Sequence, residues 1–310
     1  MPRALITGIS GQDGSYLAEY LLEKGYEVYG ISKNTKSKNL EHIASYLNLY
    51  DLDIKNEEIR TLITNIKPDE LYHLASESHI TYDNITNTVD TIAKASIFIM
   101  GVLKESLPEC KMFQAGSSQM FGDCTDEDGY QRETTPFKPV NPYGCCKVMT
   151  YHISKIYRDH FGINISNGLL FNHESIRRSD RFVTTKIVKQ AVKIKKGKAS
   201  NLILEQNNSL RDWSHAKDFV KGMWLSLQHK PDDYVFASGR SNSVEYVCNY
   251  VFDKLNLNTA SIIIKNQIHE EQIKSVGDAS KLKLTTGWNP EYTLESMLDE
   301  MIYYHYKYTV

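Results

Sequence analysis

Two short patterns in the sequence contain residues that could carry out chemistry. Gly8, Gly11 and Gly14 form a GxxGxxG pattern directly after a short apolar run. Tyr143 and Lys147 lie four residues apart, a spacing that brings two side chains to one face of a helix. The positive charge of a lysine lowers the pKa of a neighbouring phenol, so Tyr143 could act as a general base near neutral pH. With the glycine pattern upstream, this pair predicts a dehydrogenase site.

The glycine pattern predicts a dinucleotide-binding turn between a strand and a helix. Glycine permits the tight bend, lets the backbone approach a pyrophosphate and lets the helix pack on the strand. The residues expected to hold the cofactor are Gly8, Gly11, Gln12, Asp13, Gly14, Lys33, Asp51, Leu52, Leu74, Ala75, Tyr143 and Lys147. Lys33 follows the second expected strand and either pairs with a 2′-phosphate or is a solvated loop lysine. We expect NAD, with NADP as the alternative, because no arginine stands there to bind a 2′-phosphate.

Strands and helices alternate over the first 170 residues. The expected strands are 3–7, 27–31, 47–51, 70–74, 111–115 and 163–170, and the expected helices are 16–24, 56–65, 89–107 and 143–161. This alternation predicts an α/β fold with a doubly wound parallel sheet. Further helices are expected at 183–195, 216–229 and 294–305 and a strand at 234–238, whereas 172–181 and 206–212 read as irregular. We therefore expect a dinucleotide-binding domain at 1–170 and a smaller α/β substrate domain, mainly 171–310, with segments near 213–240 returning to the first.

Composition excludes several classes of protein. The net charge is −2, with 36 basic and 38 acidic residues, so no global field attracts nucleic acid or an anionic membrane. The five cysteines form no CxxC pair, which argues against a disulfide scaffold and a structural zinc site. The N-terminal apolar run is too short for a signal peptide or a membrane span. These features predict a cytoplasmic enzyme without a metal.

Longer matches point to a family. They include residues 4–18 (ALITGISGQDGSYLA), 67–71, 78–79, 141–144, 170–175 (LFNHES), 177–178, 182–184, 211–213, 215–218 and 287–288. On these residues the chain resembles the GDP-mannose 4,6-dehydratases, a branch of the extended short-chain dehydrogenase/reductase superfamily, over almost its full length. The resemblance implies a Rossmann fold and a GDP-sugar substrate.

The resemblance also implies roles for individual residues. Ser117 stands where the family has the Thr or Ser that hydrogen-bonds the sugar O4. Tyr143 would take the O4 proton while C4 gives hydride to the nicotinamide, and Lys147 would support it. The residues implied to bind substrate are Ser78, Asn172, Glu174, Arg178, Lys186, Arg211 and Glu271. Charged groups such as Arg211 suit a diphosphate, although a surface ion pair with Asp212 is the alternative. We assign His173 no catalytic role.

Several positions depart from the family pattern. Gln119 stands where the family has the glutamate that removes the C5 proton, and a neutral amide cannot do this. Losing a positioned base costs roughly 10²–10⁴ in rate. Lys33 and Asn34 replace an arginine pair, the loop after them is shorter, and 268–271 (IHEE) lacks a phosphate-binding arginine.

Three hypotheses follow for the function. The first is oxidation at C4 of a GDP-linked manno-configured sugar, GDP-mannose or a GDP-manno-heptose, to the 4-keto sugar, within nucleotide-sugar biosynthesis for glycans or polysaccharides. The second is a 4,6-dehydratase whose catalytic glutamate is replaced by Gln119. The third is a non-catalytic nucleotide sensor, which would not need Ser117, Tyr143 and Lys147 together.

A homodimer is expected to form through the helices at Val89–Leu107 and Tyr143–Phe161, giving a four-helix bundle. The first helix is apolar along more of its surface than one sheet-facing stripe requires. The resemblance implies the same contact, and the missing arginine loop makes a tetramer less expected.

Overall fold

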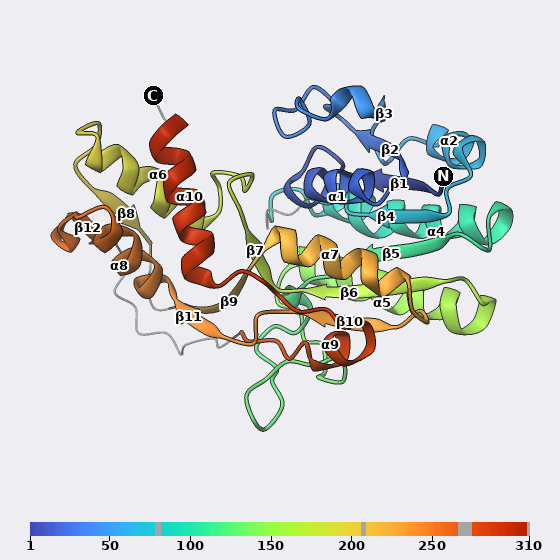
Figure 1. The fold of residues 1–310 in the computed structure, drawn as a ribbon. Helices are drawn as coiled ribbons and strands as arrows, with labels where there is room; N and C mark the ends of the chain where they lie inside the picture. The colour runs from blue at the N-terminus through green and yellow to red at the C-terminus, as the bar shows by residue number, and fades with distance from the viewer. Residues whose placement is uncertain (78–81, 206–208, 266–274, 309–310) are drawn as a thin grey trace.

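A seven-stranded parallel sheet forms the centre of the computed structural model, which describes residues 1–77, 82–205, 209–265 and 275–308 (Figure 1). The strands lie in the order β3-β2-β1-β4-β5-β6-β10. Their bounds are β1 Arg3–Thr7, β2 Glu27–Ser32, β3 Leu47–Asp51, β4 Glu70–His73, β5 Lys111–Ala115, β6 Ile165–Leu170 and β10 Asp233–Phe236. The chain order reverses between β1 and β4, and ligands of such sheets bind at the carboxyl ends of the strands near that point. The predicted doubly wound sheet is confirmed.

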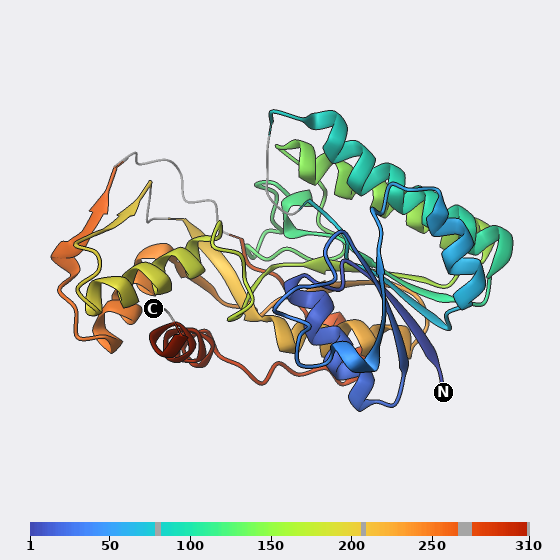
Figure 2. The ribbon, with the colours of Figure 1, turned by 90° about the horizontal axis from the view of Figure 1, so that it is seen from above.

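Helices cover both faces of the sheet (Figure 2). One face carries α1 (Gln12–Glu23), α7 (Ala216–Leu227) and α9 (Ser280–Thr286), and the other carries α2 (Glu58–Ile66), α4 (Ala95–Ser106) and α5 (Pro142–Phe161). Side chains alternate along a strand, so Ala4 and Ile6 pack towards α1 and α7 whereas Leu5 packs towards α2 and α4. No helix in the described part of the chain is long and apolar enough to cross a membrane.

The helix expected at 89–107 is part of a longer helical run. It begins with α3 (Ile85–Thr88), continues as a π-helical segment over Val89–Lys94 and ends as α4. Ile92 and Ala93 of the π-helical segment pack against Cys146 and Tyr143 in the first turns of α5. Single π-helical turns are frequent at functional sites, and this one packs against Tyr143, the predicted base.

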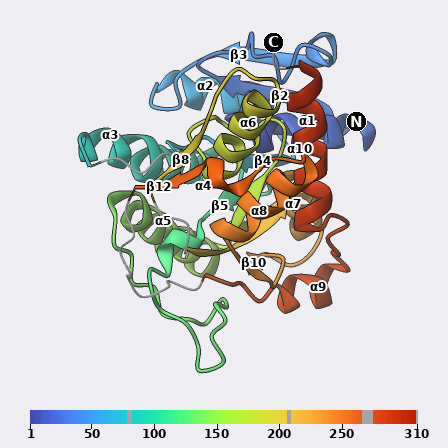
Figure 3. The same ribbon diagram turned by 90° about the vertical axis from the view of Figure 1, so that its left-hand side faces the viewer.

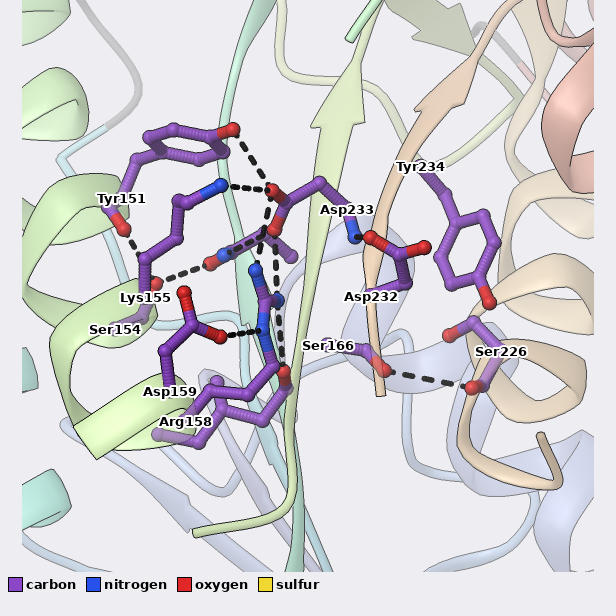
Figure 4. A network of polar contacts seen from close by, with 12 residues as sticks. Tyr151, Ser154, Lys155, Arg158, Asp159, Ser166, Ser226, Asp232, Asp233 and Tyr234 are labelled. Carbon is purple, nitrogen blue, oxygen red and sulfur yellow. Dashed lines mark hydrogen bonds and ion pairs between the residues drawn. The ribbon is translucent and has the colours of Figure 1, made fainter. Parts of the chain in front are cut away.

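A buried polar network holds α5 to the edge of the sheet (Figure 4). The Asp233 carboxylate of β10 accepts hydrogen bonds from Arg158, Tyr151 and Asn167, each at 2.8 Å. Burial opposes the charge on Asp233, but these hydrogen bonds and the Arg158 charge outweigh it and lower the pKa of Asp233 to about 2. The network fixes the C-terminal half of α5, whose first turns carry the predicted catalytic pair.

The rest of the chain forms a smaller α/β part beyond the carboxyl edge of the sheet (Figure 3). It contains α6 (Val183–Lys195), α8 (Val244–Lys254) and α10 (Leu294–Tyr308), a three-stranded sheet of β11 (Ser241–Ser243), β9 (Leu210–His215) and β7 (Asn172–Glu174), and the pair β12 (Ile262–Ile264) and β8 (Leu202–Leu204). The prediction that 172–181 and 206–212 are irregular is wrong for 172–174 and 210–212. These strands are short and polar, so no alternation of apolar residues marks them.

Candidate active site

A cavity of about 340 Å³ lies at the carboxyl edge of the central sheet, facing the smaller part. Its lining includes nine of the residues predicted for the site: Asp13, Leu74, Ser117, Gln119, Tyr143, Lys147, Asn172, Arg178 and Arg211. They come from α1, from the ends of β4 and β5, from α5, from β7 and β9 and from the connection between β7 and α6. The candidate catalytic residues and the candidate substrate cations therefore face one cavity.

Lys147 is fully inside the protein and anchored to the sheet. Its ammonium donates a hydrogen bond to the carbonyl of Ala115, the last residue of β5, at 2.8 Å. Only 3% of its surface is exposed, and burial lowers the pKa of Lys147 to about 8. The side chain is thus mainly charged at neutral pH and lies at the cavity wall.

Tyr143 lies one helical turn before Lys147, and the Lys147 Nζ is 5.6 Å from the centre of its ring. Burial raises the pKa of Tyr143, while hydrogen bonding with Ser117 and Ser76 and the charge of Arg178 counteract that rise. The net shift is upward, and the expectation that Lys147 lowers the pKa of Tyr143 stays a prediction, while the Lys147 ammonium donates to a backbone carbonyl. Ser76 was missed by the sequence analysis, although it lines the cavity.

Ser117 and Gln119 lie on a turn that follows β5. The Ser117 hydroxyl accepts a hydrogen bond from the Gln119 backbone N–H at 3.2 Å, at the start of a 3₁₀ turn over Ser118–Met120. The Gln119 side chain points towards α5, where its Oε1 accepts from Nδ2 of Asn141 at 3.0 Å. The turn thus brings a hydroxyl and an amide to the cavity beside the phenol of Tyr143.

The glycine turn between β1 and α1 has the shape that a dinucleotide needs. Gly8 has a φ of +75°, and a Cβ atom there would lie 2.9 Å from the backbone of Ala75, at the end of β4. Only glycine fits this approach. Gly11 directly precedes the first turn of α1, whose free N–H groups suit a pyrophosphate, and Gln12 and Gly14 lie in that turn. These residues fit a dinucleotide cofactor.

The other predicted cofactor residues lie at the ends of β2 and β3. The Lys33 Nζ lies 3.2 Å from a carboxylate oxygen of Asp53, so Lys33 is paired rather than simply solvated. Asp51 accepts hydrogen bonds from the backbone and the hydroxyl of Thr35, which lowers its pKa and orders the loop after β2. Leu52 follows Asp51 directly. None of these three predicted residues lines the cavity.

The glycine turn is tied directly to the smaller part of the chain. In β7, Nε2 of His173 lies 2.8 Å from Oδ2 of Asp13, and its Nδ1 lies 2.7 Å from the Phe171 carbonyl oxygen. Gln12 donates to the His173 carbonyl and accepts from Ser175. Burial opposes the charge on Asp13, but His173 and other partners keep its pKa below the ordinary value. The sequence analysis gave His173 no catalytic role, and no sequence signal showed that it joins the two halves of the site.

The predicted substrate-binding residues separate into two groups. Arg178 lines the cavity and forms a 3.2 Å ion pair with Glu174. Glu174 is buried and does not itself line the cavity. Arg211 also lines the cavity, and burial lowers its pKa. The alternative of an ion pair between Arg211 and Asp212 is wrong, because the buried Asp212 carboxylate accepts from Ser238 and Gly239 instead.

The other predicted substrate-binding residues either do not line the cavity or lie outside the described residues. Lys186 is exposed on α6 and does not line the cavity, because α6 turns that residue to solvent. Arg181, which the sequence analysis did not select, does line it. Ser78 and Glu271 lie outside the described residues. Among the residues that are described, no group of three or more His, Cys, Asp or Glu side chains could hold a metal ion.

The comparison with protein families decides where this arrangement belongs. A family model described as GDP-mannose 4,6 dehydratase matches residues 5–301. The chain belongs to the GDP-mannose 4,6-dehydratase family. This confirms the resemblance seen in the sequence and the prediction of an enzyme of this type.

Relatives in the GDP-mannose 4,6-dehydratase family match nearly the whole chain. GDP-mannose 4,6 dehydratase 2 of Arabidopsis thaliana is 38% identical over 321 residues, which cover 96% of this chain and 85% of the plant protein. The human GDP-mannose 4,6 dehydratase is 35% identical, with 97% of this chain and 90% of the human protein covered.

Solved structures of similar fold are more distant in sequence. The dTDP-glucose 4,6-dehydratase of Bacillus anthracis, in complex with NAD, has a TM-score of 0.86 at 20% identity and covers 99% of this chain and 97% of its own. The UDP-glucose 4-epimerase of Thermus thermophilus, also in complex with NAD, has a TM-score of 0.86 at 18% identity, with 99% and 100% covered. At this identity they support the fold alone.

Proposed function

We propose that the protein oxidises C4 of a GDP-linked manno-configured sugar with NAD(P) and releases the 4-keto sugar without removing water. The observation that carries this proposal is the single cavity lined by Ser117, Tyr143 and Lys147 together with Gln119. The first three supply what alcohol oxidation needs from the protein. Gln119 supplies no base for the elimination that would follow.

Each residue has a chemical task in the oxidation. Ser117 hydrogen-bonds the sugar O4, and Tyr143 accepts the proton of that hydroxyl. The positive charge of Lys147 supports Tyr143 as the base by favouring the ionised form of its phenol. A nicotinamide cofactor, when bound, accepts the hydride from C4. Gly8, Gly11 and the first turn of α1 would hold its pyrophosphate, as their fit to a dinucleotide supports.

The cations of the cavity suit the diphosphate of the substrate. Arg178 and Arg211 line the same cavity as Asn172, and Arg211 has no ion-pair partner within 4 Å among the described residues. Two phosphate charges can compensate a buried guanidinium of this kind through charge-assisted hydrogen bonds. The GDP group itself is carried over from the names of the relatives.

The alternative function is a 4,6-dehydratase, which the names of the relatives favour. Elimination of water across C5–C6 requires a base at C5 once C4 is a ketone. The amide of Gln119 cannot take that proton, and the missing base corresponds to a loss of roughly 10²–10⁴ in rate. The dehydrogenase proposal rests on this difference.

A product assay separates the two functions. The purified enzyme is incubated with NAD and with a panel of GDP-hexoses and GDP-heptoses, and products are followed by mass spectrometry and by the near-ultraviolet absorbance of the reduced cofactor. We expect a product two hydrogens lighter than the substrate and reduced cofactor in equal amount. A product one water lighter, without net reduction of the cofactor, would establish the dehydratase instead.

NAD is the cofactor that we propose. Lys33 is held by Asp53 at 3.2 Å, so the cation nearest the end of β2 already has an acidic partner. An acidic group at that place disfavours a 2′-phosphate through like-charge repulsion.

A homodimer through α4 and α5 is the assembly that we propose. The argument from the apolar residues of α4 needs correction, because Ile99, Val102 and Leu103 are fully buried within the chain. The outer face of α5 supports the dimer better. Met149 and Ile156 lie seven residues apart on that face and are 48% and 50% exposed. A second copy of α5 would cover them.

A further inference from the structure

Asn141, the residue directly before α5, holds two neighbouring groups at once. Its Oδ1 accepts a hydrogen bond from the backbone N–H of Gly144 at 2.8 Å and so caps the helix. Its Nδ2 donates to Oε1 of Gln119 at 3.0 Å. A backbone N–H can only donate, so the first bond fixes which end of the Asn141 amide faces the helix. The donor end must therefore face Gln119.

This chain of hydrogen bonds also orients the amide of Gln119. Because Oε1 faces Asn141, Nε2 is the end left for the cavity that Gln119 lines. No described residue accepts a hydrogen bond from that nitrogen. A Cβ atom on Gly144 would lie 2.6 Å from the Gln119 carbonyl oxygen, so the helix start and the turn are in close contact. The amide is held in one orientation by fixed neighbours.

We propose that Gln119 donates a hydrogen bond from Nε2 to a sugar oxygen of the bound GDP-sugar, and that Asn141 is the positioning residue that sets this polarity. The inference rests on the proposed function and adds a role to it. Gln119 then binds the sugar through a defined donor atom, in addition to lacking the basic group that elimination needs. A hydroxyl or keto oxygen is what such a donor recognises.

The substitution Asn141→Asp tests this polarity while keeping the helix cap. One carboxylate oxygen still accepts from Gly144, but the other now faces Gln119 with an acceptor. The Gln119 amide should then turn its nitrogen towards residue 141 and its oxygen towards the sugar. Binding to the NADH-loaded enzyme, which cannot oxidise the sugar, is measured by calorimetry with two probes, GDP-mannose and GDP. We expect the dissociation constant of GDP-mannose to rise roughly tenfold to a hundredfold and that of GDP to stay unchanged.

A second variant distinguishes orientation from damage to the helix. In a Gln119→Ala background the amide is absent, so Asn141→Asp should add no further loss of GDP-mannose affinity. Asn258→Asp is the matched control, because Asn258 caps an exposed turn through Ala260 and should bind both probes normally.

Three outcomes overturn the inference. They are an equal loss for GDP and GDP-mannose, a loss that persists in the Gln119→Ala background, and no loss at all. Failure of the unsubstituted enzyme to bind GDP would instead contradict the proposed function, and the inference with it.

Discussion

Tyr143 is the residue on which proton removal from the sugar depends in the proposed reaction. Burial raises the pKa of Tyr143, and hydrogen bonding with Ser117 and Ser76 and the charge of Arg178 oppose that rise, so its ionisation depends on the cavity around it. We predict that Tyr143→Phe lowers the rate of C4 oxidation by roughly 10²–10⁴, the usual contribution of a general base. The ring still packs against Ile92 and Ala93, so NAD and GDP should bind normally.

The measurement is turnover with the best GDP-sugar of the panel, alongside calorimetric binding of NAD and GDP. Substitution of the neighbouring Cys145 by Ser is the control, since Cys145 is exposed in the same helical turn. A Tyr143→Phe enzyme that keeps more than about a tenth of the rate would assign the base to another group.

Gln119 decides between the two possible products. We predict that Gln119→Glu gives the enzyme the ability to remove water. A carboxylate at this position can take the C5 proton, which the C4 ketone makes more acidic. The Asn141 Nδ2 that now donates to Gln119 would donate equally well to a carboxylate and favour its ionised form. The new base would therefore be charged at neutral pH.

Mass spectrometry of the product checks this prediction. The variant should give a product one water lighter than the substrate, and reduced cofactor should no longer accumulate. Gln119→Leu, which has no base, should give no dehydrated product. If the glutamate variant also gives no dehydrated product with any GDP-sugar tried, then a side chain at position 119 does not reach the C5 proton.

The elements of the central sheet were predictable because most of its strands are short, largely apolar segments between turns. Most strand bounds of the sheet agree within two residues, and the alternation with helices defines the parallel topology. The strands β7 and β9 were not found, since residues such as Asn172 and Arg211 are polar and face the cavity. Their pattern reflects the site that they line rather than a core.

Contacts between residues that are distant in the chain could not be predicted from the sequence either. His173 contacts Asp13 although the two are 160 positions apart in the sequence, and Asn141 contacts Gln119 although they are 22 positions apart. Short motifs marked the residues of the second pair but not their contact. The π-helical segment under Tyr143 also had no signal, because its residues continue the apolar pattern of an ordinary helix.

At the level of elements, α5 depends on the network around Asp233. We predict that Asp233→Ala lowers the free energy of unfolding by about 3–5 kcal/mol, because it leaves the buried Arg158 without its main partner. The pKa of Asp233 is about 2 in the folded protein and ordinarily 3.8, so the contribution of its charge is fully present above about pH 4. It should be lost as pH falls through about 2.

Denaturant unfolding at several pH values measures both effects. Asp159→Ala is the matched control, since Asp159 contacts the same Arg158 at 3.2 Å but is 63% exposed. That surface pair should contribute about 0–1 kcal/mol. Equal losses in the two variants would show that the buried network does not stabilise the edge of the sheet.

At the level of the whole molecule, the two parts meet at the cavity and are joined there by side chains of the glycine turn. Gln12 and Asp13 contact β7, and Arg177 further along donates to Ser15 of α1. The turn that would hold the pyrophosphate thus also fixes the segment that carries Asn172 and Arg178. One rigid arrangement can place cofactor and sugar together, as oxidation requires.

The outer face of α5 is the surface that we propose for binding a second copy. We predict a homodimer in solution, with twice the 35.5 kDa mass of the chain, and its dissociation by Ile156→Glu. The side chain of Ile156 is half exposed on the outer face of α5, and two copies would bring two carboxylates into an apolar contact. Multi-angle light scattering at micromolar concentration measures both masses. Leu284→Glu is the control, because Leu284 is 88% exposed on α9, away from α5, and its substitution should leave the dimer intact. An unsubstituted chain that is monomeric at that concentration, or a dimer that Ile156→Glu leaves unchanged, would rule out pairing through this face.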